Sequence, residues 1–160
     1  MTKKLIILAP SAGGKSTLMR YLRTRVEIPV FEMDEEVIKA NGGKWPSDND
    51  YKDQVLVPRI VEDIIKKPEI VYLASYVPKG LIEKARQNGF QVVSIHVTLE
   101  ELQVRNKNRM EEEGYDDATP WQQLQLDNFS ELTESGLIDV QIDGHQEPKG
   151  IAKEIQVLLS

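Results

Sequence analysis

The residues best suited to chemistry lie near the start of the chain, at positions 9–17, where the sequence is A-P-S-A-G-G-K-S-T. This stretch matches the phosphate-binding loop pattern G-x-x-x-x-G-K-[ST], except that Ala9 stands at the first glycine position. Gly13 and Gly14 permit the unusual dihedrals and the close approach that let consecutive backbone N–H groups face an anion. The stretch therefore predicts a site for phosphate groups.

The residues on either side of this loop predict a strand before it and a helix after it. Residues 5–8 form a short apolar run typical of a buried parallel strand, and apolar residues recur at helical spacing over 16–25. This strand-to-helix context is the one that a phosphate loop requires. The helix dipole would favour an anion, Lys15 would reach the β- and γ-phosphates of a nucleotide, and Ser16 would bind Mg²⁺.

Strands and helices alternate along the rest of the chain. Further strands are predicted at 28–33, 69–74, 91–97 and 137–142. Helices are predicted at 34–40, 51–67, 78–87, 98–113, 121–135 and 149–159. Pro58 should kink or break the 51–67 helix, with two shorter helices as an alternative.

This alternation predicts an α/β fold with a parallel sheet and helices on both faces. Ligands of such sheets bind beyond the carboxyl ends of the strands. Asp34, Ser75, the helix that carries Arg105 and the turn at 143–148 all follow strand ends, as the phosphate loop does. We therefore expect these segments to meet at one edge of the sheet.

Several of these residues have two interpretations. Asp34 suits the N-cap of the 34–40 helix and also a catalytic carboxylate, and both roles are compatible. Arg59 is either a solvated surface arginine or a contact to a second substrate. Trp45, in the loop at 41–50, either anchors that loop by packing or covers a ligand.

Arg105, Lys107 and Arg109 form a concentrated cationic cluster on the helix at 98–113. Arg105 and Arg109 project from one helix face because they are four residues apart. Glu101 and Glu113 stand at the same spacing from them, so surface ion pairing is the alternative to phosphate binding.

Length and composition limit the possible classes. The chain has 160 residues, which fits one domain, and a net charge of −6, which argues against nonspecific nucleic-acid binding. It contains no cysteine, so we expect the reducing cytoplasm, and residues 1–4 lead directly into a strand too short for a signal peptide or a membrane span. The sequence does not indicate an oligomeric state.

With these residues assembled, the chain resembles the small P-loop kinases, both the adenylate-kinase-like and the shikimate- and gluconate-kinase-like groups. The resemblance covers nearly the whole chain in order and spacing, although only the phosphate loop is a specific motif. It implies a three-layer fold with a five-stranded parallel sheet of order 2-3-1-4-5, and ATP with Mg²⁺ as donor. It also implies a single domain over 1–160, an acceptor-binding segment at about 34–67 and a lid at about 105–120.

The resemblance also implies roles for individual residues. A catalytic role is implied for Lys15, Asp34, Arg105 and Arg109. The donor nucleotide would be bound by Ala12, Gly13, Gly14, Lys15, Ser16, Thr17, Arg105, His145 and Pro148. The acceptor would be bound by Asp34, Arg59 and Ser75, and Mg²⁺ by Ser16 and Asp34.

One departure bears on the reaction: Ala74-Ser75 stands where many members carry Asp-Gly at the end of the third strand. A nucleoside or nucleotide is the acceptor that we expect first. The alternatives are a small metabolite alcohol such as a sugar acid, or a nucleotide-binding ATPase or regulator without an acceptor. Arg59 is the only arginine between Val26 and Lys67, which favours an uncharged or singly anchored acceptor over a phosphate.

Replacing the loop lysine tests the donor site. We expect Lys15→Ala to abolish phosphoryl transfer while the fold stays intact, because the mutation removes the cation that meets the transferring phosphates. A coupled assay of ATP consumption measures this. Retained turnover would contradict the kinase interpretation.

Overall fold

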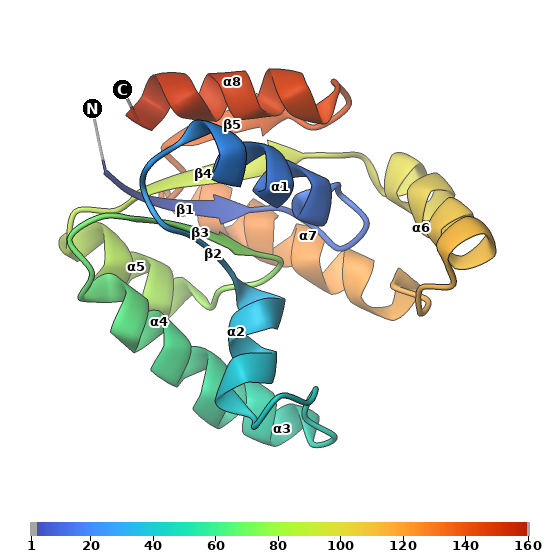
Figure 1. Ribbon diagram of the computed structural model, residues 1–160, viewed down its shortest axis with the longest axis horizontal. Helices are drawn as coiled ribbons and strands as arrows, with labels where there is room; N and C mark the ends of the chain where they lie inside the picture. The colour runs from blue at the N-terminus through green and yellow to red at the C-terminus, as the bar shows by residue number, and fades with distance from the viewer. Residues whose placement is uncertain (1–2, 160) are drawn as a thin grey trace.

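The computed structural model describes residues 3–159 and is built around a five-stranded parallel sheet (Figure 1). The strands lie in the order β2-β3-β1-β4-β5, which confirms the predicted order. Their bounds are β1 Lys4–Leu8, β2 Val30–Glu32, β3 Ile70–Ala74, β4 Gln91–His96 and β5 Val140–Asp143. Met1 and Thr2, which the sequence analysis includes in the lead to the first strand, lie outside the described residues.

The central strands are apolar on both faces because helices cover the sheet from both sides. In β1, Ile6 lies opposite Tyr72 of β3 and Leu5 lies opposite Val71, and all four side chains are buried. The backbone pairing continues past the strand, since the Ala9 N–H donates to the Ala74 carbonyl at 3.0 Å. The start of the phosphate loop is thus held at the carboxyl edge of the sheet.

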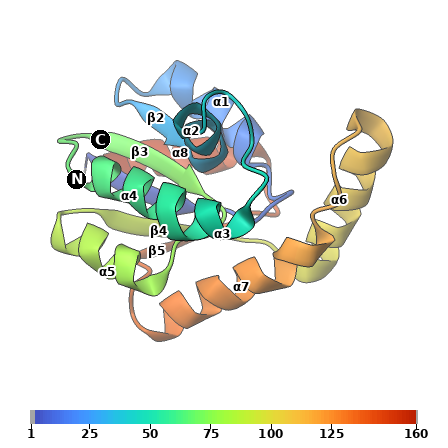
Figure 2. The same cartoon turned by 90° about the horizontal axis from the view of Figure 1, so that it is seen from below.

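Helices α1 (Lys15–Arg25) and α8 (Pro148–Leu159) lie side by side on one face, and α4 (Val57–Ile65), α5 (Lys79–Gln87) and α7 (Thr119–Glu134) cover the other (Figures 1 and 2). Helix α6 (Leu99–Glu113) projects beyond the carboxyl edge of the sheet. No helix within residues 3–159 is both long and apolar enough to cross a membrane.

The start of α2 (Met33–Ala40) corrects one prediction. The N-cap is Glu32 and not Asp34, because a Glu32 carboxylate oxygen accepts the Glu35 backbone N–H at 2.9 Å. The helix therefore begins one residue before Asp34, and β2 is shorter than predicted. Asp34 lies in the first turn of α2, and its carboxylate does not cap the helix.

The disturbance predicted at Pro58 takes the form of a π-helical turn. Helix α3 (Asn49–Tyr51) continues through this turn, Lys52–Leu56, into α4 without a break. The Val57 N–H bonds the Lys52 carbonyl five residues back, and Pro58, which has no N–H to donate, follows this turn directly. Such turns commonly occur at functional sites.

Other boundaries agree within a few residues. Thr98 caps α6 by accepting the Glu101 N–H at 3.3 Å, as predicted, and Gly89 follows α5 with a φ of 88°. The fifth strand begins at Val140 and not at residue 137. Leu137 instead closes the end of α7, because its N–H donates to the Leu132 carbonyl.

The turn after β5 provides a test of the packing at the sheet edge. A Cβ at Gly144 would lie 2.5 Å from Val97 Cγ2 and 2.8 Å from the His96 carbonyl oxygen. Gly144→Ala should therefore lower the free energy of unfolding by about 1–3 kcal/mol, the usual cost of overpacking. Thermal or urea unfolding followed by circular dichroism measures this.

Gly80→Ala is the matched control, because a Cβ there meets nothing within 4 Å and the residue lies in a helix. It should leave stability unchanged or raise it. Equal stability of the Gly144→Ala variant and the parent would contradict the proposed crowding.

Candidate active site

The phosphate loop has the backbone geometry of an anion cradle. The Gly13 N–H donates to the Pro10 carbonyl at 2.8 Å, and a Cβ at Gly13 would lie 2.7 Å from that oxygen. Gly14 has a φ of 86°, and Ala12, which is not a glycine, has a φ of 69°. Glycine is thus needed at position 13 because the backbone approaches the Pro10 carbonyl closely, and at position 14 because φ is left-handed. The left-handed Ala12 is a strained feature that the sequence pattern did not indicate.

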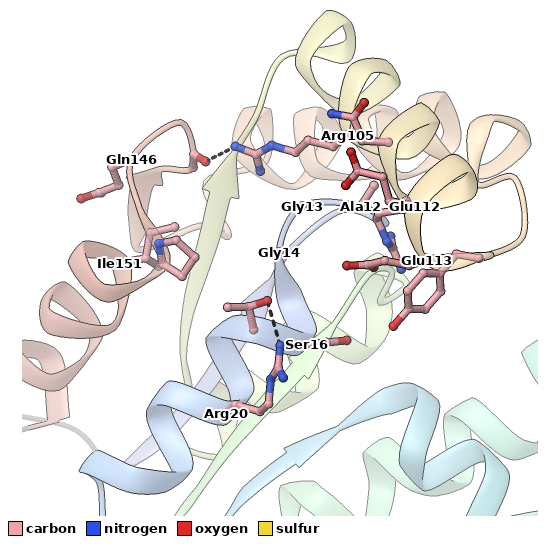
Figure 3. A pocket seen from close by; sticks show the side chains of 16 residues that line it. Ala12, Gly13, Gly14, Ser16, Arg20, Arg105, Glu112, Glu113, Gln146 and Ile151 are labelled. Carbon is pink, nitrogen blue, oxygen red and sulfur yellow. Dashed lines mark hydrogen bonds between the residues drawn. The ribbon is translucent and has the colours of Figure 1, made fainter.

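A first cavity of about 690 Å³ opens beside this loop (Figure 3). Three segments far apart in the chain form it: the loop with the start of α1, helix α6, and the turn after β5. It thereby collects most of the residues predicted for the donor site. Those in the lining are Ala12, Gly13, Gly14, Ser16, Thr17, Arg105, Arg109 and Pro148.

Arg105 ties α6 to the turn after β5. Its Nη2 donates to the Gly144 carbonyl at 2.9 Å and its Nε donates to a Glu101 carboxylate oxygen at 3.0 Å, as Figure 3 shows for the contact to the turn. Arg105 therefore forms the predicted ion pair with Glu101 and also lines the cavity that contains the phosphate loop. Arg109 differs: its guanidinium lies 4.3 Å from the centre of the Tyr115 ring, and within residues 3–159 no ion pair joins it to Glu113.

His145 lies in the same turn but does not line the first cavity. Its backbone N–H donates to an Asp143 carboxylate oxygen at 2.9 Å, and its ring Nδ1 lies 2.8 Å from the same oxygen. These two hydrogen bonds hold the pKa of Asp143 below its usual value. The Thr98 N–H approaches His145 Nε2 at 3.3 Å. His145 therefore shapes the turn that presents Gly144 and Pro148.

The loop lysine is buried in a small cluster of charges. Lys15 Nζ lies 2.9 Å from a Glu32 carboxylate oxygen and 3.5 Å from an Asp34 oxygen. Glu32 is buried, whereas the Asp34 side chain is 47% exposed. Burial, followed by the charges of Glu32 and Asp34, raises the pKa of the neighbouring Tyr72 phenol well above its usual value. The phenol thus remains neutral beside this acidic cluster.

Glu32 is not among the site residues predicted from the sequence. The available signal is its place two residues after buried Val30 in a strand, which puts a carboxylate on an inward face. A buried carboxylate needs a charged or hydrogen-bonding partner, and Lys15 is that partner.

A second cavity of about 510 Å³ lies on the other side of the phosphate loop. Ser11 of the loop, Asp34 and Ser75 line it, so the structure brings these predicted residues together. Arg59 is not brought there: it is exposed on α4 and absent from the lining of either cavity. Trp45 lines this cavity, as the ligand-covering interpretation requires.

Three polar residues of α7, Gln122, Gln125 and Asn128, form a stripe that contacts the phosphate loop and its neighbours. Gln125 Oε1 accepts the Ser11 N–H at 2.7 Å and Gln125 Nε2 donates to Ser11 Oγ at 2.9 Å. Gln122 donates to the Leu102 carbonyl of α6, and Asn128 donates to the Val77 carbonyl after β3. All three side chains are buried, as Phe129 and Leu132 of the same helix are.

The predicted metal ligands suit a cation that is only partly bound by protein. Ser16 lines the first cavity and Asp34 the second, on either side of Lys15. Across the described part of the chain, no three His, Cys, Asp or Glu side chains gather as a metal site. Mg²⁺ accepts one or two protein ligands when phosphates and water supply the others. The hydroxyl and the exposed carboxylate fit this requirement.

The fold resembles that of several solved kinases. A shikimate kinase from Aquifex aeolicus aligns with a TM-score of 0.70 and 20% identity, covering 98% of this chain and 95% of that one. A gluconokinase from Sinorhizobium meliloti 1021 aligns with a TM-score of 0.66 and 21% identity, covering 98% and 90%. The chain has the P-loop kinase fold.

A third structure is a shikimate kinase from Acinetobacter baumannii in complex with shikimate, with a TM-score of 0.69, 14% identity and coverage of 99% and 93%. The sequence matches no protein-family model and no curated protein. At these identities the likeness establishes the P-loop kinase fold, and the chemistry must be argued from the site itself.

Gln125→Ala tests whether α7 positions the phosphate loop. The mutation removes both contacts to Ser11, so ATP would have to order the released loop on binding. An ordering cost of about 1.4 kcal/mol would weaken ATP binding roughly tenfold. Titration calorimetry with ATP measures the affinity. Gln123→Ala is the matched control, because Gln123 is exposed and its side chain donates to Asp127 of its own helix. Equal ATP affinity of the two variants would contradict a positioning role.

Proposed function

We propose that the protein transfers the γ-phosphate of ATP to a hydroxyl group of a small metabolite. The observation that carries this proposal is that two cavities share the phosphate loop: Ser11 lines the second, and the adjoining residues from Ala12 onward line the first. A γ-phosphate held by the loop would therefore lie between a donor cavity and an acceptor cavity.

The first cavity suits ATP. Its volume of about 690 Å³ accommodates a nucleotide, and it combines a phosphate cradle with the arginines of α6. Arg105 holds the turn that would contact the adenine, and Arg109 can leave the Tyr115 ring for the phosphates when α6 closes. We assign donor binding to this cavity and the lid to residues 105–120.

The acceptor is better described as an alcohol than as a phosphate. Within residues 3–159 the lining of the second cavity contains no arginine, although arginine is the usual bidentate partner of a phosphate. The names of the similar structures, shikimate kinase and gluconokinase, also favour a small metabolite alcohol over the nucleotide that we expected first. The second cavity itself argues against an ATPase that has no acceptor.

Asp34 is suited to receive the proton of that alcohol. It lines the acceptor cavity, is accessible, and does not cap a helix. The acceptor oxygen forms a bond to the γ-phosphorus as the bond to the β-phosphate oxygen breaks. The hydroxyl proton passes to Asp34 and then to solvent, and ADP and the phosphorylated alcohol leave.

Lys15 can serve the transferring group without giving up Glu32. An ammonium has three donors, and the Glu32 and Asp34 contacts use two of them. Phosphate oxygens would take the third and compete with Asp34, which frees the carboxylate toward the acceptor. Mg²⁺, held by Ser16, Asp34 and the nucleotide, would neutralise charge on the transferring phosphates.

Asp34→Asn tests the base. We expect kcat to fall by about 10²- to 10⁴-fold, the usual contribution of a general base, and the Kd for ATP to rise by a much smaller factor. Steady-state kinetics with an alcohol that the parent protein phosphorylates measure the first effect, and calorimetry with ATP measures the second. Asp63→Asn, on the exposed face of α4, should leave both unchanged. An unchanged kcat in Asp34→Asn would remove Asp34 from the mechanism.

The structure also refines the Lys15→Ala experiment. Lys15→Ala removes the cation that pairs with the buried Glu32 carboxylate, and an unpaired buried charge can lower the free energy of unfolding by about 3–5 kcal/mol. The variant Lys15→Met with Glu32→Gln removes both charges together and should melt closer to the parent. Loss of transfer in this folded double variant isolates the catalytic role of Lys15.

A further inference from the structure

The second cavity also indicates which alcohol it binds, an inference that rests on the proposed function. We propose that the acceptor carries no negative charge and presents a flat apolar ring, with its hydroxyl directed to Asp34. The argument comes from the exposed aromatic side chains and from the charges that line this cavity.

Exposed apolar side chains gather here from three separate segments. Trp45, Tyr76, Trp121 and Leu124 are 47%, 36%, 50% and 57% exposed, and all four line the second cavity. They come from the loop before α3, the loop after β3, and α7. Large apolar side chains that are exposed around one concavity usually mark a binding surface. A ligand that covers them must itself offer apolar area.

The two tryptophans make a ring the best-suited ligand surface. Indole faces pack favourably on flat, polarizable groups, and such contacts add to the effect of area burial. A polyol without a ring would cover the same side chains with hydroxyl groups and leave those groups without partners. Several polar side chains of the lining already have partners, since Gln125 bonds Ser11 and Lys52 pairs with Asp53. These side chains are therefore less available to such hydroxyls than Asn49, Ser75 and Tyr76 are.

The charges of the lining disfavour an anion. The charged side chains among its residues are Asp34, Asp53 and Lys52, so carboxylates outnumber the single cation. Lys52 is already engaged: its Nζ lies 3.4 Å from an Asp53 oxygen and 5.3 Å from the centre of the Trp45 ring. A carboxylate or phosphate entering this cavity would meet like charges and no unengaged guanidinium.

The π-helical turn fixes this arrangement. Lys52 and Asp53 both belong to it, and the extra residue per turn rotates them relative to the helix that follows. Lys52 is thereby held over Trp45, where its charge is shared between the ring and Asp53 and not directed at a ligand. This local geometry favours a neutral acceptor.

Matched pairs of alcohols test the inference with the full chain and ATP. Each pair joins a neutral, ring-bearing alcohol to an anionic counterpart that keeps a primary hydroxyl: a nucleoside with its 3′-monophosphate, and 1,4-benzenedimethanol with 4-(hydroxymethyl)benzoate. Shikimate, gluconate and glycerol extend the panel. We expect kcat/KM to be at least tenfold higher for a neutral ring-bearing alcohol than for its anionic counterpart or for glycerol.

Variants of the lining give an independent readout. Trp45→Ala and Trp121→Ala should each raise the KM for the ring-bearing acceptor about tenfold while kcat and the KM for ATP stay within about twofold. Val104→Ala, an exposed apolar residue of α6 outside both linings, is the matched control. Asp53→Arg should shift the preference toward the anionic member of each pair, because it replaces a carboxylate with a guanidinium and releases Lys52.

The possible outcomes separate this inference from the proposed function. Efficient phosphorylation of shikimate, gluconate or a nucleotide, with the neutral ring-bearing alcohols poor, would overturn the inference and leave the kinase function standing. Failure to bind ATP by calorimetry would overturn the kinase function and the inference with it. If ATP binds but no alcohol is phosphorylated, ligand-observed NMR with a non-hydrolysable ATP analogue decides. Failure of the neutral ring-bearing alcohols to bind there would overturn the inference.

Discussion

The buried pairing of Lys15 with Glu32 is the interaction on which the site depends. Lys15 lies in the segment after β1, and Glu32 is the last residue of β2. Strand β3 lies between β1 and β2 in the sheet, so the contact spans the carboxyl end of β3. A buried cation requires such a partner, and the pairing therefore keeps the start of α1 close to the start of α2. Asp34 is carried into the site by the same contact, since it lies two residues beyond Glu32 on α2.

The polar stripe of α7 serves as a second support. Its three buried amides contact the phosphate loop, α6 and the loop after β3, which are the segments that line the two cavities. Buried amides are expensive unless they are hydrogen-bonded, so they tolerate few alternative positions of the backbone that they bond. An all-apolar helix face would pack against the sheet equally well but would not position Ser11.

The two cavities differ in the chemistry of their walls, although they share one loop. The first cavity combines backbone N–H groups with arginines, which are groups that suit phosphate. The second cavity combines tryptophans with carboxylates, which suit a ligand of a different kind. The π-helical turn before Pro58 contributes to this contrast, because it places a lysine where an aromatic ring and a carboxylate already engage it. The π-helical turn thus contributes to the charge of the second cavity's wall.

The sequence by itself determined the elements whose signals are local. The phosphate loop, the order of strands and helices, the Thr98 cap and the disturbance at Pro58 could all be predicted, because each depends on neighbouring residues or on periodicity. Only the tertiary structure identified Glu32 as the partner of Lys15, placed Gln125 on Ser11 and left Arg59 outside the cavities. These contacts join residues that are far apart in the chain. Their existence depends on how the helices pack on the sheet, which no local pattern encodes.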